Sequence, residues 1–446
     1  MKYTILGSAR SGTALAGLLK ENNEEVFVSE LNKISDDNKK YYNSIGVIYE
    51  EGGHSEKVLE CDVIAISPGI PDTIKIVEEG VKNGKELTSE IEIAFRYYKG
   101  KTIAITGTNG KTTVTALTGF IFKLCNYESY TAGNIGTPFS SVARVASSIG
   151  ICALEVSSFQ LEHVKLFKPV ISVILNITPD HLDRYVSFDE YANAKYNITK
   201  NQSENDIIIL NYDDLKLKEL IPNKGVKKLY FSLTNEVPIG AFLKNNKIFL
   251  KIENSEGIEF IEVIDVKDIF IIGSHNYANA MVAMLIAYSM KVPFEIICKG
   301  LKEFKGVSHR LEQVRKLKGV KYVNDSKATN VDATEVALKS FEEPIILIAG
   351  GISKKNNYDS IIELIKSRVK AVVLIGIASD EMNLAFEGIT KIVKAGNELE
   401  NALRIAQNIA EDGDVVLLSP ACASFDMFNN YEHRGDVFKE LVMNLK

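Results

Sequence analysis

The sequence lacks closely spaced cysteines and has few histidines. Its five cysteines are too far apart for a Cys-x-x-Cys metal or redox motif: Cys61, Cys125, Cys152, Cys298 and Cys422. Their odd number argues against a disulfide framework, so we expect reduced thiols, as in cytosolic proteins. The six histidines show no His-x-x-x-His spacing, and we therefore predict no zinc site.

Long apolar runs and blocks of basic residues are also missing. The most apolar segments, 281–288 and 371–378, are far shorter than the roughly 20 residues that cross a membrane, and residues 1–7 are too short for a signal peptide. Lys and Arg total 52 and Asp and Glu total 58, a formal net charge of −6. Proteins that bind duplex nucleic acid neutralise its phosphates with clustered Lys and Arg residues. Because this chain is mildly acidic and has no basic block, we expect no nucleic-acid partner. We also expect no membrane partner and a cytoplasmic location.

The length and the pattern of apolar runs predict an α/β fold with parallel sheets. A chain of 446 residues has room for about three domains. Short apolar runs alternate with helical patterns such as 276–290 and 398–409, as expected where parallel strands are buried on both faces. The predicted strands are 3–6, 63–67, 102–106, 149–154, 170–175, 345–348, 371–375 and 415–418.

Two breaks in this pattern divide the chain. A helix ends near residues 98–100 before a new strand, and residues 305–309 separate a helical run from another strand. Residues 225–269 hold many short β-type runs with polar flanks, which we expect to form an antiparallel insertion at the end of the middle domain. The predicted domains are residues 1–98, 99–308 and 309–446.

The strongest motif is a glycine loop between an apolar strand and an apolar-periodic helix. N–H groups of such a loop, with the helix N-terminus behind them, bind nucleotide phosphates. Lys111 would reach the terminal phosphates, and the Thr112 hydroxyl would ligate Mg²⁺. A chance Lys-Thr after a glycine turn is the alternative, which the flanking strand and helix make the weaker one. The loop residues are Gly107, Thr108, Asn109, Gly110, Lys111, Thr112 and Thr113.

A second glycine turn, residues 7–12, follows the first strand and precedes a helix. Ala9 stands where the dinucleotide-binding motif has its second glycine, which lets the backbone approach a pyrophosphate. Glu30, after a strand at 26–28, is placed to hold a ribose or a uridine. A closing turn that binds no ligand explains residues 7–12 about as well as a ligand-binding turn does. An NAD-binding enzyme is a rival, but it would leave the loop at Gly107 unexplained.

Polar residues follow neighbouring strands of the middle domain. Glu155 is where a P-loop protein completes its Mg²⁺ shell, and a helix-capping carboxylate is the alternative. The next strand ends in a polar cluster, Asn176–Tyr185, where open α/β sheets bind ligands. His181 is a candidate functional residue only because it lies in that cluster, since a lone histidine is more often an ordinary core or surface residue. Asn276 and Asn279 share one face at the start of a later helix, where helix capping is the alternative.

Together these motifs resemble the Mur ligase family, the ATP-dependent amide-forming ligases of peptidoglycan precursor synthesis. The glycine loop resembles the family's own phosphate loop, which lacks the first glycine of the generic motif. The resemblance implies a Rossmann-like N-terminal domain, a central P-loop ATPase domain with a mainly parallel sheet, and a Rossmann-like C-terminal domain. Four further segments resemble those of the D-glutamate-adding members: 155–161, 180–185, 325–330 and 419–425.

The resemblance also implies a reaction. ATP would phosphorylate the carboxylate of UDP-N-acetylmuramoyl-L-alanine, and the amine of D-glutamate would attack the resulting acyl phosphate. Lys111 and two Mg²⁺ ions would neutralise the phosphate charge. The implied Mg²⁺ ligands are Thr112, Glu155 and His181, and the implied nucleotide contacts are Asn276, Asn279, Arg310 and Asp325. The implied D-glutamate contacts are Lys327, Thr329, Lys354 (with Lys355 as the alternative), Ser424 and Phe425, and the UDP-sugar contacts are Ser11, Glu30, Ser67, Gly69 and Asn134.

Lys195 stands at the spacing of a family lysine that is carbamylated by CO₂. Ser187–Glu190 is a capping box, which places Lys195 about two turns into a helix. Without the resemblance, an exposed lysine on an amphipathic helix is the expected interpretation. With it, the carbamate would offer an oxygen anion to the second Mg²⁺. Its formation requires the neutral amine, which partial burial favours.

Two alternative functions stay open. A folylpolyglutamate synthetase-like ligase also joins glutamate to a carboxylate, but by family resemblance such enzymes lack the about 100 residues that precede the phosphate loop here. A GTPase-type switch would need a guanine-reading Asn-Lys-x-Asp segment, which we do not find at a strand end. The expected partners are small-molecule substrates, and the expected oligomeric state is a monomer.

Overall fold

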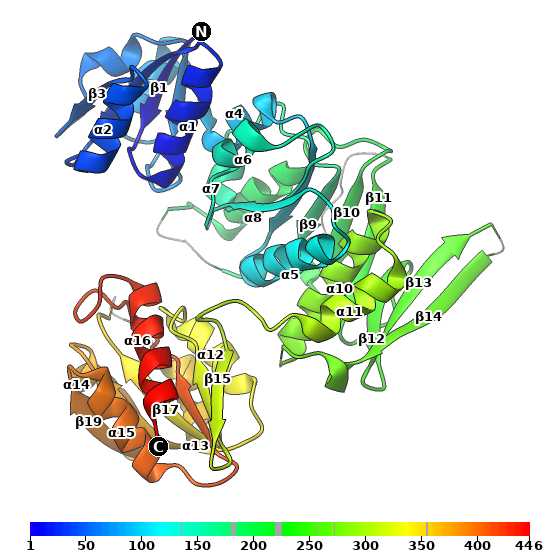
Figure 1. Ribbon diagram of the computed structural model, residues 1–446, viewed down its shortest axis with the longest axis vertical. Helices are drawn as coiled ribbons and strands as arrows, with labels where there is room; N and C mark the ends of the chain where they lie inside the picture. The colour runs from blue at the N-terminus through cyan, green and yellow to red at the C-terminus, as the bar shows by residue number, and fades with distance from the viewer. Residues whose placement is uncertain (135, 180–183, 219–224, 256, 272, 354–355) are drawn as a thin grey trace. The chain divides into compact units, whose positions relative to one another are not determined.

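The computed structural model describes residues 1–134, 136–179, 184–218, 225–255, 257–271, 273–353 and 356–446. Among these residues the strands form three sheets flanked by helices (Figure 1). The α/β class with mainly parallel sheets is therefore confirmed. The chain forms two compact units, Met1–Ile269 with Tyr277–Phe304, and Phe270–Asn276 with Lys305–Lys446. The domain limits at residues 98 and 308 stay predictions.

The first sheet consists of parallel strands within the described part of the chain. Its strand order, 3-2-1-4-5, is that of a doubly wound sheet without the sixth strand, and in such sheets ligands bind beyond the carboxyl ends of the strands. In that order the strands are β3 (Ile48–Glu51), β2 (Glu25–Glu30), β1 (Lys2–Leu6), β4 (Val63–Ile66) and β5 (Glu86–Ser89). The helices are α1 (Arg10–Glu21), α2 (Asp36–Ser44), α3 (Lys75–Lys82) and α4 (Glu90–Tyr97).

The second sheet carries the phosphate loop. Strands β6 to β11 pair parallel with one another. The two strands beside β6, β8 and β9, are wholly buried and mostly apolar. In spatial order the strands are β14 (Gly257–Asp265), β13 (Lys247–Asn254), β12 (Gly240–Lys244), β11 (Lys227–Ser232), β10 (Ile207–Asn211), β9 (Ile171–Ile174), β6 (Lys101–Thr106), β8 (Ile151–Glu155) and β7 (Ser129–Gly133). The helices are α5 (Lys111–Leu124), α6 (Phe139–Val145), α7 (Ser158–Leu161), α8 (Phe188–Tyr196), α9 (Leu215–Lys218), α10 (Ser274–Ser289) and α11 (Phe294–Glu303).

The insertion at residues 225–269 is only partly antiparallel, and the prediction was wrong in this respect. β11 pairs parallel with β10, and β12 pairs parallel with β11. Residues 233–239 carry the chain back along the sheet before β12 begins, which gives β12 the direction of β11. Only β12, β13 and β14 form an antiparallel meander, and the β13–β14 hairpin projects from the sheet (Figure 1).

The third sheet is parallel except for its first strand, since β15 pairs antiparallel with β16. Its strands, in spatial order, are β15 (Glu312–Leu317), β16 (Val320–Asn324), β20 (Val415–Leu418), β17 (Ile345–Gly350), β18 (Val369–Ile375) and β19 (Lys391–Gly396). The helices are α12 (Val331–Lys339), α13 (Asp359–Arg368), α14 (Ser379–Phe386), α15 (Leu399–Ile409) and α16 (Tyr431–Asn444). Short 3₁₀ helices elsewhere in the chain are Glu56–Leu59, Asn197–Thr199 and Val266–Asp268.

Two buried carboxylates of α4 fasten the first sheet's domain to the middle one. Glu92 accepts hydrogen bonds from the backbone N–H groups of Lys165, Leu166 and Phe167 at 2.9 to 3.1 Å. Glu90 accepts from the Ser140 N–H at 2.6 Å, and burial raises the pKa of its carboxyl. Because a buried carboxylate without partners is costly, these bonds stabilise the contact between the two domains, which belong to one compact unit.

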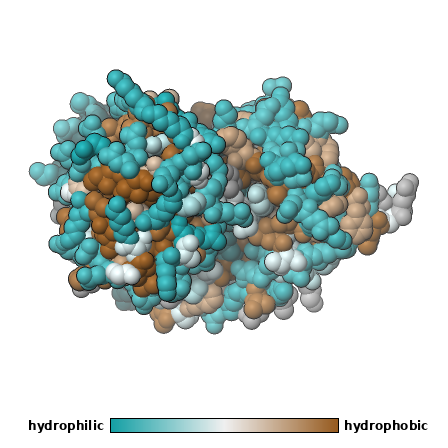
Figure 2. All heavy atoms as spheres, turned by 90° about the horizontal axis from the view of Figure 1, so that it is seen from below, coloured by the Kyte–Doolittle hydropathy of each residue, from teal (hydrophilic) through white to brown (hydrophobic). Residues whose placement is uncertain are grey.

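Side chains divide between core and surface as expected for globular domains. The strands and the inner faces of the helices supply the buried apolar residues. Hydrophilic side chains cover most of the face seen in Figure 2, and hydrophobic ones gather in smaller areas. Over the described residues, none of the helices has the length and apolar character needed to cross a membrane.

Candidate active site

The phosphate loop connects β6 to α5. Gly110 has a φ of +90°, and a Cβ at this position would lie 2.6 Å from Asn279 Oδ1. Glycine is therefore required where the loop enters the helix. Asn279, predicted to face the nucleotide, packs against the loop from α10. The first N–H groups of a helix have no intrahelical acceptor, so those of α5 are available to phosphate oxygens.

Residues at the end of β9 hold this loop in shape. The Thr108 N–H donates to the Asn176 carbonyl at 3.0 Å, and the Asn109 N–H donates to Asn176 Oδ1 at 2.8 Å. The Thr108 hydroxyl donates to the Thr178 carbonyl at 3.2 Å. The sequence drew attention to the Asn176–Tyr185 cluster but gave no role to Asn176. Its position at the end of the strand beside β6 was the available signal.

Two lysines share the carbonyl oxygen of Gly107. Lys111 Nζ donates to it at 2.8 Å and to the Thr108 carbonyl at 2.9 Å, and Lys195 Nζ donates to it at 3.1 Å. Lys195 is 2% exposed, and its Nζ lies 4.5 Å from the centre of the Tyr191 ring. Helical periodicity alone suggested an exposed lysine, and that interpretation is wrong. Two cationic side chains therefore converge on the predicted phosphate site.

The capping box predicted before Lys195 is only half formed. Ser187 Oγ accepts from the Glu190 N–H at 3.2 Å and caps α8 as expected. The Glu190 carboxylate accepts from the Val186 N–H at 2.8 Å, one residue before the N-cap position that the capping box requires.

Glu155 ends β8 directly beside the strand of the phosphate loop. In the parallel pairing of β6 and β8, Glu155 lies opposite Ile105, and its carboxylate is buried and accepts from Asn134 Nδ2 at 3.3 Å. Thr112 is in the first turn of α5. A carboxylate and a hydroxyl are oxygen ligands of the kind that Mg²⁺ prefers, so these residues fit a magnesium-bound nucleotide. His181, the third predicted ligand, lies outside the described residues.

A cavity of about 970 Å³ opens at the carboxyl ends of the first sheet. That volume suits a nucleotide-sized ligand. The cavity extends to the end of β7 in the middle domain, so both domains contribute to it. All five residues assigned to the UDP-sugar by resemblance line it: Ser11, Glu30, Ser67, Gly69 and Asn134.

Glu30 is held as an ionised acceptor in this cavity. Burial acts to raise the pKa of Glu30, but hydrogen bonds from Ser8 and from the Asn32 N–H outweigh it and leave the pKa lowered. An ionised carboxylate can accept from ribose hydroxyls or from base N–H groups. His54 and Lys75 also line the cavity; sequence reasoning missed them because no local motif marks them.

The polar segments of the third domain meet at one edge of its sheet. Strands β16, β20 and β17 are neighbours. The predicted segments 325–330 and 419–425 follow β16 and β20, and the loop that contains Lys354 follows β17. The Ile352 N–H donates to the Ala423 carbonyl at 2.9 Å, which joins two of the loops. Lys354 lies outside the described residues, and Phe425 is 70% exposed. The other predicted D-glutamate contacts on these loops are Lys327, Thr329 and Ser424.

Asp325 is buried behind this edge. Its Oδ2 accepts from the Ser419 hydroxyl at 2.8 Å, and its Oδ1 accepts from the Leu311 N–H at 3.2 Å. Burial raises the pKa of Asp325 to about 7, against these hydrogen bonds and the nearby Arg310 guanidinium, which lower it. The two predicted nucleotide clamps, Arg310 and Asp325, are thus neighbours. Asn276 falls in the same compact unit as they do, and Asn279 in the other.

Replacing Asp325 by asparagine should flatten the dependence of stability on pH. The aspartate ionises near pH 4 in the unfolded chain and near pH 7 in the folded one, so between these values the folded state binds more protons and stability falls as pH rises. The contribution lost by pH 7 is roughly 4 kcal/mol at most. Thermal unfolding followed by circular dichroism from pH 4 to 8 measures it. Exposed Asp412→Asn is the control. If stability changed with pH equally in both variants, the raised pKa of Asp325 would be refuted.

Arg434 connects the loop that contains Asp325 to the loop that contains Cys422. It is fully buried; Nε donates to Ser326 Oγ at 2.9 Å, Nη2 to the Ser326 carbonyl at 2.8 Å, and Nη1 to the Cys422 carbonyl at 3.2 Å. Burial lowers its pKa to about 10, which leaves it charged at neutral pH. Sequence reasoning missed Arg434, because its partners lie up to 108 residues away.

We expect Arg434→Lys to destabilise the third domain and to weaken D-glutamate binding. A lysine cannot reproduce the fork of donors, so buried carbonyls lose their partners, which costs about 3 kcal/mol. The melting temperature and the KM for D-glutamate measure the two effects. Exposed Arg404→Lys, in the same domain, should change neither quantity. A normal KM for D-glutamate in Arg434→Lys would show that the loops joined by Arg434 do not bind D-glutamate.

The sequence matches known families over most of its length. It matches the MurD N-terminal domain at residues 2–75, the Mur ligase middle domain at 105–287, and the Mur ligase glutamate ligase domain at 309–422. A UDP-N-acetylmuramoylalanine–D-glutamate ligase from Salinibacter ruber is 42% identical, over 100% of this chain and 98% of that protein. The enzyme of the same name from Clostridioides difficile is 40% identical, over 100% and 99%.

Solved structures share the fold at lower identity. The UDP-N-acetylmuramate–alanine ligase of Thermotoga maritima matches with a TM-score of 0.61 and 17% identity, over 100% of both chains. A pseudomurein peptide ligase type C from Methanothermus fervidus matches with a TM-score of 0.59 and 22% identity, also over 100% of both. The protein has the three-domain α/β architecture of these ligases. It belongs to the Mur ligase family.

Proposed function

We propose that the protein joins D-glutamate to UDP-N-acetylmuramoyl-L-alanine with ATP, as a step of peptidoglycan precursor synthesis in the cytoplasm. One observation carries the proposal. Asn134 lines the first-domain cavity and also donates to the Glu155 carboxylate, which stands beside the phosphate loop. A UDP-sugar in that cavity would therefore extend its free carboxylate toward the terminal phosphate of ATP.

The chemistry follows from charge. The carboxylate attacks the γ-phosphorus, forming an acyl phosphate and releasing ADP. Anions must approach each other in this step, so positioned cations lower its barrier. Lys111 Nζ is held within 3 Å of two loop carbonyls, Gly107 and Thr108, close to where the phosphates bind. Bound Mg²⁺ supplies further neutralisation, and Thr112, Glu155 and a carbamylated Lys195 would hold two such ions.

The third domain would supply the amine. D-Glutamate carries two carboxylates, which cationic and hydroxyl donors recognise; Lys327, Thr329 and Ser424 offer such donors on neighbouring loops. The amine attacks the acyl carbon, loses a proton, and phosphate leaves as the amide forms. The match of residues 2–75 to the MurD N-terminal domain favours this substrate over a folate, because folylpolyglutamate synthetase-like enzymes lack that domain.

An omission assay tests the proposal. Phosphate release from ATP is measured with UDP-N-acetylmuramoyl-L-alanine and D-glutamate together, with each alone, and with L-glutamate or a folate in the corresponding place. We expect sustained release only with the first pair. Release driven by a folate and glutamate would instead support the alternative ligase. Size-exclusion chromatography in the same buffer tests the expected monomer.

A further inference from the structure

Arg184 of the middle domain holds a loop of the first-domain cavity. Its Nη1 donates to the Pro68 carbonyl at 3.0 Å, across 116 residues of sequence. Pro68 lies between Ser67 and Gly69, and all three line the cavity. Ser67 Oγ donates to the Leu6 carbonyl at 2.9 Å. The loop is therefore attached to its own sheet at Ser67 and to the middle domain at Pro68.

The guanidinium of Arg184 is itself fixed by α7 and its C-terminal neighbour. It lies 4.0 Å from the centre of the Phe159 ring, and Nη2 pairs with Glu162 Oε2 at 3.3 Å. The Tyr185 hydroxyl donates to the other oxygen of Glu162. Only 18% of the Arg184 side chain is exposed. A planar cation with donors on two sides is needed here, because one side reaches Glu162 while the other reaches Pro68.

The same contacts continue to the phosphate loop. The Tyr185 ring is 5.3 Å from the Tyr191 ring, and the Tyr191 hydroxyl lies 3.1 Å from Thr108 Oγ1. Packed side chains therefore connect Pro68 in the cavity to Thr108 in the loop that would hold ATP. This network therefore links the cavity loop to the phosphate loop.

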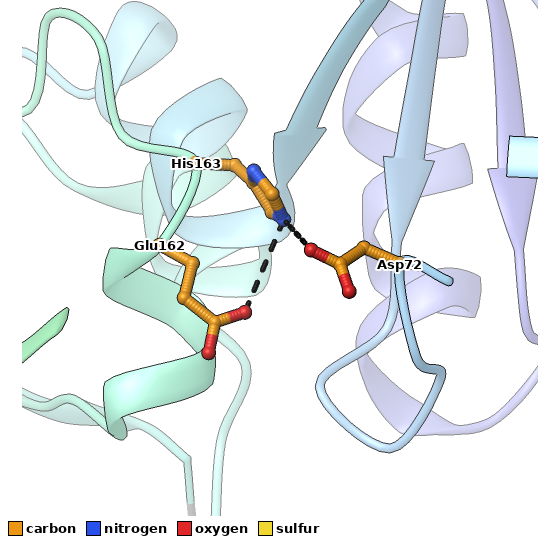
Figure 3. Close-up of side chains that lie close together, drawn as sticks. All are labelled: Asp72, Glu162 and His163. Atoms are coloured by element: carbon orange, nitrogen blue, oxygen red, sulfur yellow. Dashed lines mark ion pairs between the residues drawn. The ribbon is translucent and has the colours of Figure 1, made fainter. Parts of the chain in front are cut away.

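Beside this network, another contact joins the same two domains. Asp72 of the first domain pairs with His163 Nε2 at 3.4 Å, and Glu162 Oε2 is 3.9 Å from the same nitrogen (Figure 3). Burial lowers the pKa of His163 and raises that of Glu162. Asp72, Glu162 and His163 thus lie together where the first and middle domains meet.

We propose that Arg184 is a positioning residue that sets the Ser67–Gly69 loop in register with the phosphate loop. The UDP-sugar bound on that loop then presents its carboxylate in line with the γ-phosphate. This inference rests on the proposed function. Arg184 touches neither reacting group, and it acts through the Pro68 carbonyl.

Arg144 provides a matched control. It too reaches from the middle to the first domain, where Nε donates to Glu21 of α1 at 2.8 Å, but it does not line the cavity. The variants are Arg184→Gln, Arg184→Lys, Arg184→Ala and Arg144→Gln, each checked by its melting profile. Steady-state kinetics gives KM for UDP-sugar and ATP separately, and calorimetry gives the affinity for UDP alone.

We expect Arg184→Gln to lower kcat/KM for the UDP-sugar by about 100-fold, the cost of a small misplacement of reactants, and to weaken UDP binding. The KM for ATP should stay within about 2-fold, lysine should restore part of the loss, and added guanidine should partly rescue Arg184→Ala. Equal losses in Arg144→Gln, or unchanged UDP binding and KM in Arg184→Gln, would overturn the proposal. A wild-type protein that binds UDP but does not ligate D-glutamate would instead refute the function.

Discussion

Replacing Lys111 by alanine should lower ATP-dependent ligation by about 1,000-fold, the upper range for removing one preorganised group that stabilises developing charge. The ammonium lies 2.8 Å from the Gly107 carbonyl and 2.9 Å from that of Thr108, so it needs little movement to reach a phosphate bound in the loop. The apolar residues of β6 and α5 fold the region, and the lysine adds charge to it. The melting profile should therefore change little.

Lys123→Ala is the control for this variant. Lys123 lies in the last turn of the same helix and is exposed, so its removal changes net charge equally without touching the loop. Phosphate release with all substrates present measures both variants. Near-normal turnover in Lys111→Ala, with an unchanged melting profile, would refute the assignment of residues 107–112 to ATP. A loss of the same size in Lys123→Ala would show that net charge is responsible.

The strands were predictable because strands that are buried on both faces consist of consecutive apolar residues. The runs at 102–106 and 415–418 are parallel strands buried on both faces, and no polar residue interrupts either pattern except threonine. Strand direction was harder. Residues 227–232 and 240–244 read as neighbouring β runs, and their short separation favours an antiparallel pair, yet they lie parallel. Direction depends on how a connection packs, which periodicity does not encode.

The phosphate loop was predictable for a local reason. The loop is one continuous segment, in which a strand is followed by a glycine with positive φ and by a lysine that begins a helix. The conformation of the loop therefore depends on residues that are close together in sequence. For the cavity of the first domain, the residue pattern indicated only the turn at 7–12 and Glu30, and the family resemblance supplied the other contacts. Its residues come from separate turns, including the one after β7, and only the folded chain brings Ser11 and Asn134 to one cavity.

Arg184 and Arg434 show what sequence patterns leave out. Arg434 is buried and Arg184 is partly buried, so both cations would be penalised if they were unpaired, and helical or strand periodicity does not indicate such arginines. Each donates to a distant backbone carbonyl, Arg184 to that of Pro68 and Arg434 to that of Cys422, which any residue type could offer. When an arginine donates to a backbone carbonyl, the identity of the residue that offers this carbonyl does not indicate the contact. Such residues become visible only when the two segments are placed together.

Lys195→Ala should lose most activity, and acetate or formate should restore part of it. The side chain is 2% exposed and ends 3.1 Å from the Gly107 carbonyl, which Lys111 also contacts. Two ammonium groups near one carbonyl repel each other, and a carbamate on Lys195 would replace one of the cations with an oxygen anion that suits Mg²⁺. Truncation leaves space that a small carboxylate can enter, with its charge where the carbamate would be.

The measurement is phosphate release against acid concentration, in Lys195→Ala and in Lys200→Ala. Lys200 lies five residues further on and donates to the Val164 carbonyl at 3.1 Å, so its loss removes a comparable bond away from the phosphate loop. We expect rescue in the first variant alone, and none by ammonium or methylamine, since a cation would restore only the unmodified lysine. Native mass spectrometry of the wild type should show added CO₂ that is absent from Lys195→Ala. Full activity in that variant, or an unmodified lysine in fully active wild-type protein, would refute the carbamate.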